Sequence, residues 1–252
     1  MKKLFLGSVA LVALSLGTPA GFAADRRVPA YAPPPPPVPV YTWSGCYAGA
    51  SAGTSTGRVS STYGDVNRTL FPAGVPGASA TNDFNLSGFI GGAQLGCNYQ
   101  VGAWVWGIEG DWSATNKDGQ ATELAAPAFQ YQITERWLAT ARGRLGLAGW
   151  WGDKTLIYVT GGGAWAKVTA NNYPLAATVR PAAIEDGTMT GWTVGGGLEY
   201  ALGYGWSVKG EYLYVQFDDK TFLGPTNPVA LAAFNTKLND HIWRAGMNYK
   251  FW

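Results

Sequence analysis

The chain has 252 residues, of which 47% are hydrophobic, 14% aromatic and only 13% charged. A soluble domain carries about 25% charged residues, so the composition argues against the water-exposed surface of an ordinary soluble domain. The apolar content excludes a disordered chain. The formal net charge of +2 gives no electrostatic case for nucleic acid as a partner.

Residues 1–24 have the pattern of a secretory signal peptide. MKK supplies a positive start, LFLGSVALVALSLG a short apolar stretch, and the small residues around Ala23 and Ala24 a cleavage site. The apolar stretch is too short for a membrane anchor, which is the alternative. Removing Lys2 and Lys3 from the 18 basic residues makes them equal in number to the 16 acidic ones. Export would place the chain in an oxidising compartment.

Residues 25–42 are predicted to form a Pro-rich spacer in the periplasm. The segment contains DRRVPAYAPPPPPVPVY, whose run of prolines cannot enter a sheet or the interior of a helix. It favours an extended polyproline II conformation. A peptide-docking motif is the alternative. The remaining residues, 43–252, form the predicted folded domain.

From residue 43 onward the main pattern is alternation with a period of two, which is typical of β-strands. In WVWGIEGDW, Trp104 and Trp112 lie on one face, and Glu109 and Asp111 on the other. The fifth segment, LIYVTGGGAWAKV, leaves open which row faces inward. The eight predicted strands lie at residues 43–62, 85–100, 103–115, 131–151, 155–171, 187–202, 205–220 and 237–252.

The connections between these segments alternate in length. Short connections are predicted at 101–103, 152–154 and 203–205, and long ones at 63–84, 116–130, 172–186 and 221–236. Such alternation indicates an up-and-down arrangement with two unlike ends. The predicted fold class is therefore all-β, an eight-stranded antiparallel up-and-down transmembrane β-barrel. A soluble sandwich is the alternative, because soluble antiparallel sheets also alternate.

Aromatic residues recur eight positions apart on one face of four strands. Eight strand residues span about 26 Å, or about 20 Å along the axis when the strands tilt by about 40°. An outward apolar band bordered by aromatic girdles is typical of a transmembrane barrel, and Trp and Tyr favour the headgroup level. We expect the following residues to face lipid at the membrane interfaces: Trp104, Trp112, Trp192, Tyr200, Trp206, Tyr214, Trp243 and Phe251.

The opposite row carries charges that we expect inside the barrel. An eight-stranded barrel has room only for its own side chains, and an unpaired charge there is costly. The expectation is a lumen plugged by ion pairs, and a narrow porin-like path for small ions or solutes is the alternative. The predicted interior charges are Glu109, Asp111, Arg142, Arg144, Glu199, Lys209, Glu211, Arg244 and Lys250.

Three segments carry a resemblance to a known family. WSGCYAGASAG (43–53), GFIGGAQLGCNYQ (88–100) and the C-terminal RAGMNYKFW resemble the small outer-membrane immunogenic proteins of alphaproteobacteria, a RopB-like group of porin-family barrels. The resemblance implies a barrel in the outer membrane of a Gram-negative bacterium, with its N-terminus and short turns in the periplasm. It also implies a role in envelope integrity and surface exposure and not in catalysis.

The C-terminus departs from that family in one respect. Outer-membrane barrels usually end on an aromatic residue of the lipid-facing row, whereas here Phe251 lies in that row and Trp252 follows on the other. We expect the outer-membrane assembly machinery to recognise this aromatic strand, with the signal centred on Phe251.

Cys46 and Cys97 are expected near the periplasmic end of the first two strands, at similar heights. An oxidising compartment favours a disulfide between them; two free thiols are the alternative, and two cysteines alone offer no metal site. His241 is the single histidine. A lipid A-modifying enzyme would need a nucleophile and an orienting group beside it, but Trp243 is its neighbour on that face and Asp240 points the other way.

We therefore expect no enzyme activity, no cofactor and no metal. The expected partners are outer-membrane lipid and lipopolysaccharide. The long outer loops are candidates for contact with a ligand or protein that the sequence does not specify.

Overall fold

The computed structural model describes residues 41–66, 75–125, 127–174, 185–227 and 230–251. The predicted signal peptide, nearly all of the predicted spacer and Trp252 lie outside these residues. In the described part of the chain, no helix is long and apolar enough to cross a membrane.

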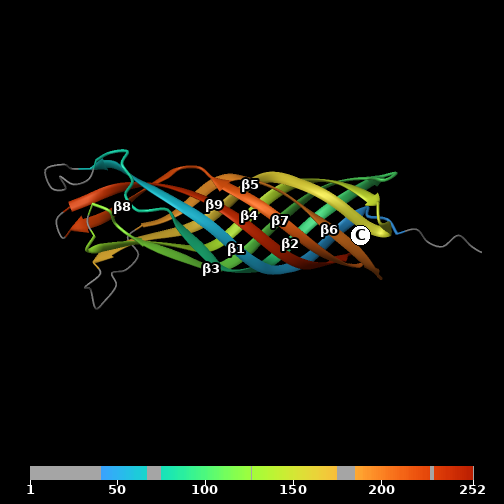
Figure 1. Cartoon of the computed structure of the whole chain (residues 1–252). Coiled ribbons are helices and arrows are strands. Elements are labelled where there is room, and N and C mark those ends of the chain that lie inside the picture. The colour runs from blue at the N-terminus through green and yellow to red at the C-terminus, as the bar shows by residue number, and fades with distance from the viewer. Residues whose placement is uncertain (1–40, 67–74, 126, 175–184, 228–229, 252) are drawn as a thin grey trace, which may run out of the picture. The chain divides into compact units, whose positions relative to one another are not determined.

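The alternating rows form antiparallel strands that wind around one axis (Figure 1). Eight of them close a ring in the order β1-β2-β3-β4-β5-β6-β7-β9, because β9 pairs with both β7 and β1. The strands are β1 Gly45–Val66, β2 Phe84–Val101, β3 Trp104–Thr122, β4 Phe129–Gly149, β5 Gly152–Pro174, β6 Glu185–Gly203, β7 Trp206–Phe217, β8 Lys220–Asn227 and β9 Ala230–Lys250. The prediction of an eight-stranded all-β barrel is confirmed.

One strand outside the ring, β8, corrects the prediction of a long loop at 221–236. Residues 220–227 instead form β8, which pairs with the first part of β9. Gly224 and Pro225 suggested a loop, but proline is tolerated in an edge strand, where its missing N–H needs no partner. In the same way β3 continues to Thr122, into the predicted loop at 116–130.

The short turns lie at the end of the barrel that carries Tyr41 and Phe251. The turn between β4 and β5 is formed by Trp150 and Trp151, not by residues 152–154 as predicted. Gly149 and Gly152 flank it with φ values of 84° and 105°, a backbone conformation that glycine adopts without strain. We call the part of the barrel at this end the lower half; it lies to the right in Figure 1. The part with the long connections, where β8 lies, is the upper half and lies to the left. In outer-membrane barrels the short turns are periplasmic.

The fifth strand, whose facing the sequence left open, points Leu156 and Tyr158 inward and Ile157 and Val159 outward. A disulfide joins Cys46 and Cys97, which lie directly opposite each other on β1 and β2. The prediction of this bond is confirmed.

The interior has three layers. At the lower end Trp43 packs against Val105, Leu156 and Ala201, and its backbone N–H donates to Gln100 Oε1 at 2.7 Å. Charged side chains follow, and above them lies an apolar core. The apolar core includes Val59, Tyr63, Leu86, Ile90, Tyr131, Ile133, Leu138, Val168, Met189, Leu213, Val215, Phe217, Phe222, Phe234, Leu238 and Ile242.

Candidate functional site

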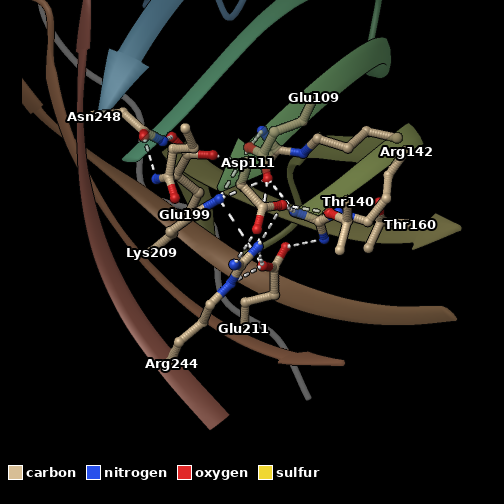
Figure 2. A network of polar contacts seen from close by, with 12 residues as sticks. Glu109, Asp111, Thr140, Arg142, Thr160, Glu199, Lys209, Glu211, Arg244 and Asn248 are labelled. Atoms are coloured by element: carbon tan, nitrogen blue, oxygen red, sulfur yellow. Dashed lines mark hydrogen bonds and ion pairs between the residues drawn. The ribbon is translucent and has the colours of Figure 1, made fainter. Parts of the chain in front are cut away.

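Eight charged side chains from five strands meet in the lumen, and Figure 2 labels all of them except Arg144. Inward-facing positions of β3, β4, β6, β7 and β9 supply four cations and four carboxylates, so their charges balance. Each residue is at most 7% exposed. We call this set the charged layer; it consists of Glu109, Asp111, Arg142, Arg144, Glu199, Lys209, Glu211 and Arg244.

Two arginines on different strands hold the same two carboxylates. Arg142 contacts Asp111 at 3.0 Å and Glu211 at 3.1 Å, and its Nη2 also lies 2.5 Å from Glu109 Oε1. Arg244 Nε donates to Glu211 at 2.7 Å, and Arg244 Nη1 donates to Asp111 at 2.8 Å. Charge-assisted bonds of this length offset the cost of taking ions out of water. They also tie β4 and β9 together across the lumen.

Lys209 and Arg144 complete the lower part of the layer. Lys209 Nζ donates to both oxygens of Glu109 at 2.9 Å, and Arg144 Nη2 donates to Glu199 at 2.7 Å. Every cation of the charged layer therefore faces at least one carboxylate.

Two tyrosines that sequence reasoning missed belong to this network. The Tyr47 hydroxyl donates to Glu109 at 2.6 Å and accepts from Arg144 at 2.7 Å. The Tyr158 hydroxyl donates to Glu211 at 3.0 Å, and its ring lies 3.8 Å below the Arg144 guanidinium. The usable signal for Tyr47 was its place in an alternating row of the first strand. The row containing Tyr158 could not be assigned to a face.

The structure does not bring Lys250 into the charged layer. Its ammonium donates to the Thr42 carbonyl at 2.5 Å and lies 4.6 Å from the ring of Tyr41. Lys250 is the last residue of β9, so its row has already reached the lower rim of the barrel. The expectation that it is an interior charge is therefore corrected.

A second buried ion cluster lies above the charged layer and was missed. Lys117 Nζ lies 2.7 Å from Glu135 Oε2 and 2.5 Å from Asp240 Oδ2, and all three side chains are fully buried. Lys117 also donates to the Ser55 hydroxyl at 3.1 Å. Lys117 falls in a predicted loop. Glu135 faces inward because a bulge between residues 135 and 137 reverses the alternation of β4.

The outer face carries the predicted aromatic residues. Tyr214 is half-buried there and the other seven are exposed; these are Trp104, Trp112, Trp192, Tyr200, Trp206, Trp243 and Phe251. That they mark the two water–lipid boundaries stays a prediction, based on the preference of Trp and Tyr for the headgroup level.

His241 lies exposed on the same outer face. Its Nδ1 is 2.7 Å from the Tyr212 hydroxyl, and its ring centre is 5.2 Å from that of Tyr214. Asp240 points inward to Lys117. Among the residues that the structure describes, no group of three or more His, Cys, Asp and Glu side chains is placed to hold a metal ion.

Known proteins are similar to this chain in sequence and in fold. The chain matches the family described as outer membrane protein beta-barrel domain over residues 10–251. It is 31% identical to the 31 kDa outer-membrane immunogenic protein of Brucella melitensis, with full coverage of both chains. It is 27% identical to the 25 kDa outer-membrane immunogenic protein of that organism, covering all of this chain and 99% of the other.

Among solved structures, the outer membrane protein OprG of Pseudomonas aeruginosa matches with a TM-score of 0.52. The match covers 82% of this chain and 96% of OprG at 13% identity, which supports the fold alone. The family match and the full-length Brucella relatives together place this chain in the outer membrane of a Gram-negative bacterium. The chain belongs to the outer membrane protein beta-barrel family.

Proposed function

We propose that this protein is a structural barrel of the outer membrane, with a lumen plugged by paired charges, that supports envelope integrity and surface presentation. The observation that carries the proposal is the charged layer. Its side chains reach across the lumen from five strands and bind one another. An ion passing through would have to break several buried ion pairs, each costly to separate.

The layers on either side support the same function. Trp43 is 3% exposed and packs inside the lower mouth. In the upper half, Phe234 stacks on Tyr131 with ring centres 4.9 Å apart. An apolar interior of this kind offers an ion no substitute for its hydration shell. Wide aqueous channels are found in barrels of about 16 strands or more, twice the number in this ring.

The rival function, a narrow channel for small ions or solutes, is tested by planar-bilayer recording. We expect the folded wild-type protein to give no stable conductance steps. The double variant Arg142→Ala with Arg244→Ala removes the cations that bridge β4 and β9, so it should give steps that the wild type lacks. Steady wild-type steps abolished by neutralising Arg142 or Arg144 would instead establish a channel and overturn the plug.

The envelope role is tested in cells. A strain lacking the protein should become more sensitive to detergents and to large antibiotics, and the wild-type gene should restore resistance. Unchanged sensitivity of the deletion strain would argue against a role in integrity.

We also propose that the protein is not an enzyme. The rings of Tyr212 and Tyr214 surround His241, while the acid next to it in sequence is bound to Lys117 in the interior. If His241→Ala changed the lipid A of the host strain, this part of the proposal would be wrong. Recognition of the C-terminal strand by the assembly machinery and contact with lipopolysaccharide belong to the same proposal. Phe251, exposed directly after β9, supports the first.

A further inference from the structure

Three neighbouring strands form a slot on the lipid-facing surface. The register aligns Ala52 of β1 with Ala245 of β9, and Ala245 with Gly210 of β7. Three small residues therefore lie side by side at one level of the register. One step higher stand Trp243 and Tyr212, with ring centres 4.5 Å apart. Together they line a groove of about 560 Å³ with a floor of small residues and an aromatic wall.

The surface becomes polar directly above this slot. The next step upward aligns Thr56, His241 and Tyr214 across the same three strands. The Tyr212 hydroxyl engages Nδ1 of His241 at 2.7 Å, which leaves Nε2 as the ring nitrogen for a ligand.

One step further up, Arg58 of β1 lies beside Asn239 of β9. Its guanidinium is 2.9 Å from Asp83, and the two side chains are 64% and 42% exposed. A hydrogen bond from Ser60, together with Arg58, holds the pKa of Asp83 below its ordinary value, so this carboxyl is charged at neutral pH. Exposed pairs of this kind contribute little to stability, and a phosphate can therefore compete with Asp83 for Arg58.

The heights of these groups match the layers of a bilayer. Each two-residue step rises about 5 Å along a barrel axis. If Trp243 stands at the edge of the hydrocarbon, His241 lies about 5 Å above that edge on the same strand. Arg58 lies two steps up on the neighbouring strand, about 7–13 Å above the edge, because register partners in strands tilted by about 40° differ in height by about 3 Å. The headgroup layer is roughly 5–8 Å thick on each side. The slot thus faces acyl chains, whereas His241 and the flexible Arg58 side chain face phosphates.

We infer that the outer face of β1, β7 and β9 binds one phosphorylated lipid of the outer leaflet, with an acyl chain in the slot and a phosphate at His241 and Arg58. In an outer membrane that lipid is lipopolysaccharide. The inference names a site for the lipopolysaccharide contact proposed above. It is independent of whether the lumen is plugged or open.

Native mass spectrometry of the detergent-purified protein tests the phosphate contact. The protein is titrated with phosphorylated lipid A and, separately, with dephosphorylated lipid A. We expect the wild type to prefer the phosphorylated form. The double variant Arg58→Gln with His241→Gln should weaken binding of the phosphorylated form about tenfold, as expected for losing a charge-assisted bond. Binding of the dephosphorylated form should be unchanged. Equal binding of the two lipids by the wild type, or no effect of the double variant, overturns the inference.

Gly210→Leu tests the slot. A Cβ at Gly210 would meet no atom within 4 Å, so the variant should fold normally. Gly210→Leu should weaken binding of both lipid A forms about fourfold, which corresponds to the contribution of one buried methylene group. Gly110→Leu on β3 is the matched control, since a Cβ there would meet its nearest atom at 3.8 Å. Gly110→Leu fills a larger groove of about 720 Å³. Above that groove the outward row of β3 carries Asn116 and Asp118, which offer a phosphate no cation. Equal weakening by both variants would mean a non-specific lipid coat and overturn the site.

A gain of affinity gives a further test that does not depend on damage to the protein. Asp83→Asn removes the carboxylate that competes for Arg58, and we expect about threefold tighter binding of phosphorylated lipid A, in line with a weak exposed pair. If Asp83→Asn tightens binding of both lipid forms equally, or of neither, the result counts against Arg58 as the phosphate ligand. Heat-modifiable gel mobility confirms that each variant is folded before the comparison is made.

Discussion

The lower and upper halves of the barrel have opposite polarity. In the lower half the outward rows are apolar and aromatic, as at Trp106 and Ile108, and the inward rows form the charged layer. In the upper half the outward rows are polar, as at Arg58 and Asp118, and the inward rows form the apolar core. The same period-two pattern thus builds an inside-out arrangement suited to lipid in the lower half and an ordinary one suited to water in the upper half.

The cluster of Lys117, Glu135 and Asp240 lies between the two halves. Like the charged layer it is buried, but one cation serves two carboxylates. In the charged layer, by contrast, Glu109 contacts Arg142, Arg144 and Lys209. The comparison predicts that loss of one cation is more costly at the junction than within the charged layer.

The largest effect is expected for Lys117→Met. It leaves Glu135 and Asp240 buried without a cation, and breaking a buried pair in this way costs about 3–5 kcal/mol. The free energy of unfolding, measured by urea titration in detergent micelles, should fall by that amount. Lys237→Met is the control, because Lys237 is 64% exposed in its pair with Asp219 and its loss should cost under about 1 kcal/mol. Equal effects of the two variants would contradict the role given to the junction.

An intermediate effect is expected for Lys209→Met. Glu109 keeps Arg142 at 2.5 Å and the Tyr47 hydroxyl at 2.6 Å, so the loss is that of bonds to a charged group, about 1.5–3 kcal/mol. The same urea titration provides the measurement. A loss larger than that of Lys117→Met would show that the charged layer lacks the redundancy inferred from its contacts.

The smallest effect concerns Glu123 in the upper half, which accepts bonds from Tyr63 at 2.7 Å and from Asn172 at 3.1 Å. Burial raises the pKa of Glu123 above its ordinary value, so the folded state favours the protonated form. The stability contributed by this group is complete below the ordinary carboxyl pKa. It is lost as the pH rises through the raised pKa.

Hydrogen exchange of the β3 and β5 amides near Glu123 should therefore be slower at low pH than at neutral pH, after correction for the intrinsic rate. Glu123→Gln has no proton to lose, so its corrected protection should be flat over the same range. A wild-type protein as flat as the variant would rule out Glu123 as the cause.

Much of the lower half could be predicted from the sequence. The alternation in WVWGIEGDW separated Glu109 and Asp111 from Trp104 and Trp112, and the structure has them on opposite faces. This worked because lipid outside and a narrow lumen inside leave no freedom in which row is apolar. The strands of the upper half were harder to predict, because a water-facing surface permits polar residues, proline and irregular strands. The sequence therefore predicts loops where the structure has β8 and the upper part of β3.

By itself, the sequence determined the all-β barrel, its export, the inward-facing charges of the charged layer and the cysteine pair, because each depends on local alternation or on position along the chain. The tertiary structure alone decided which charges meet. The bulge at Glu135 turns that side chain inward, and the ring closure by β9 aligns Arg244 with Glu211 of β7. It also set Ala52, Ala245 and Gly210 side by side. Contacts between strands distant in sequence depend on register and closure, and no single segment encodes these.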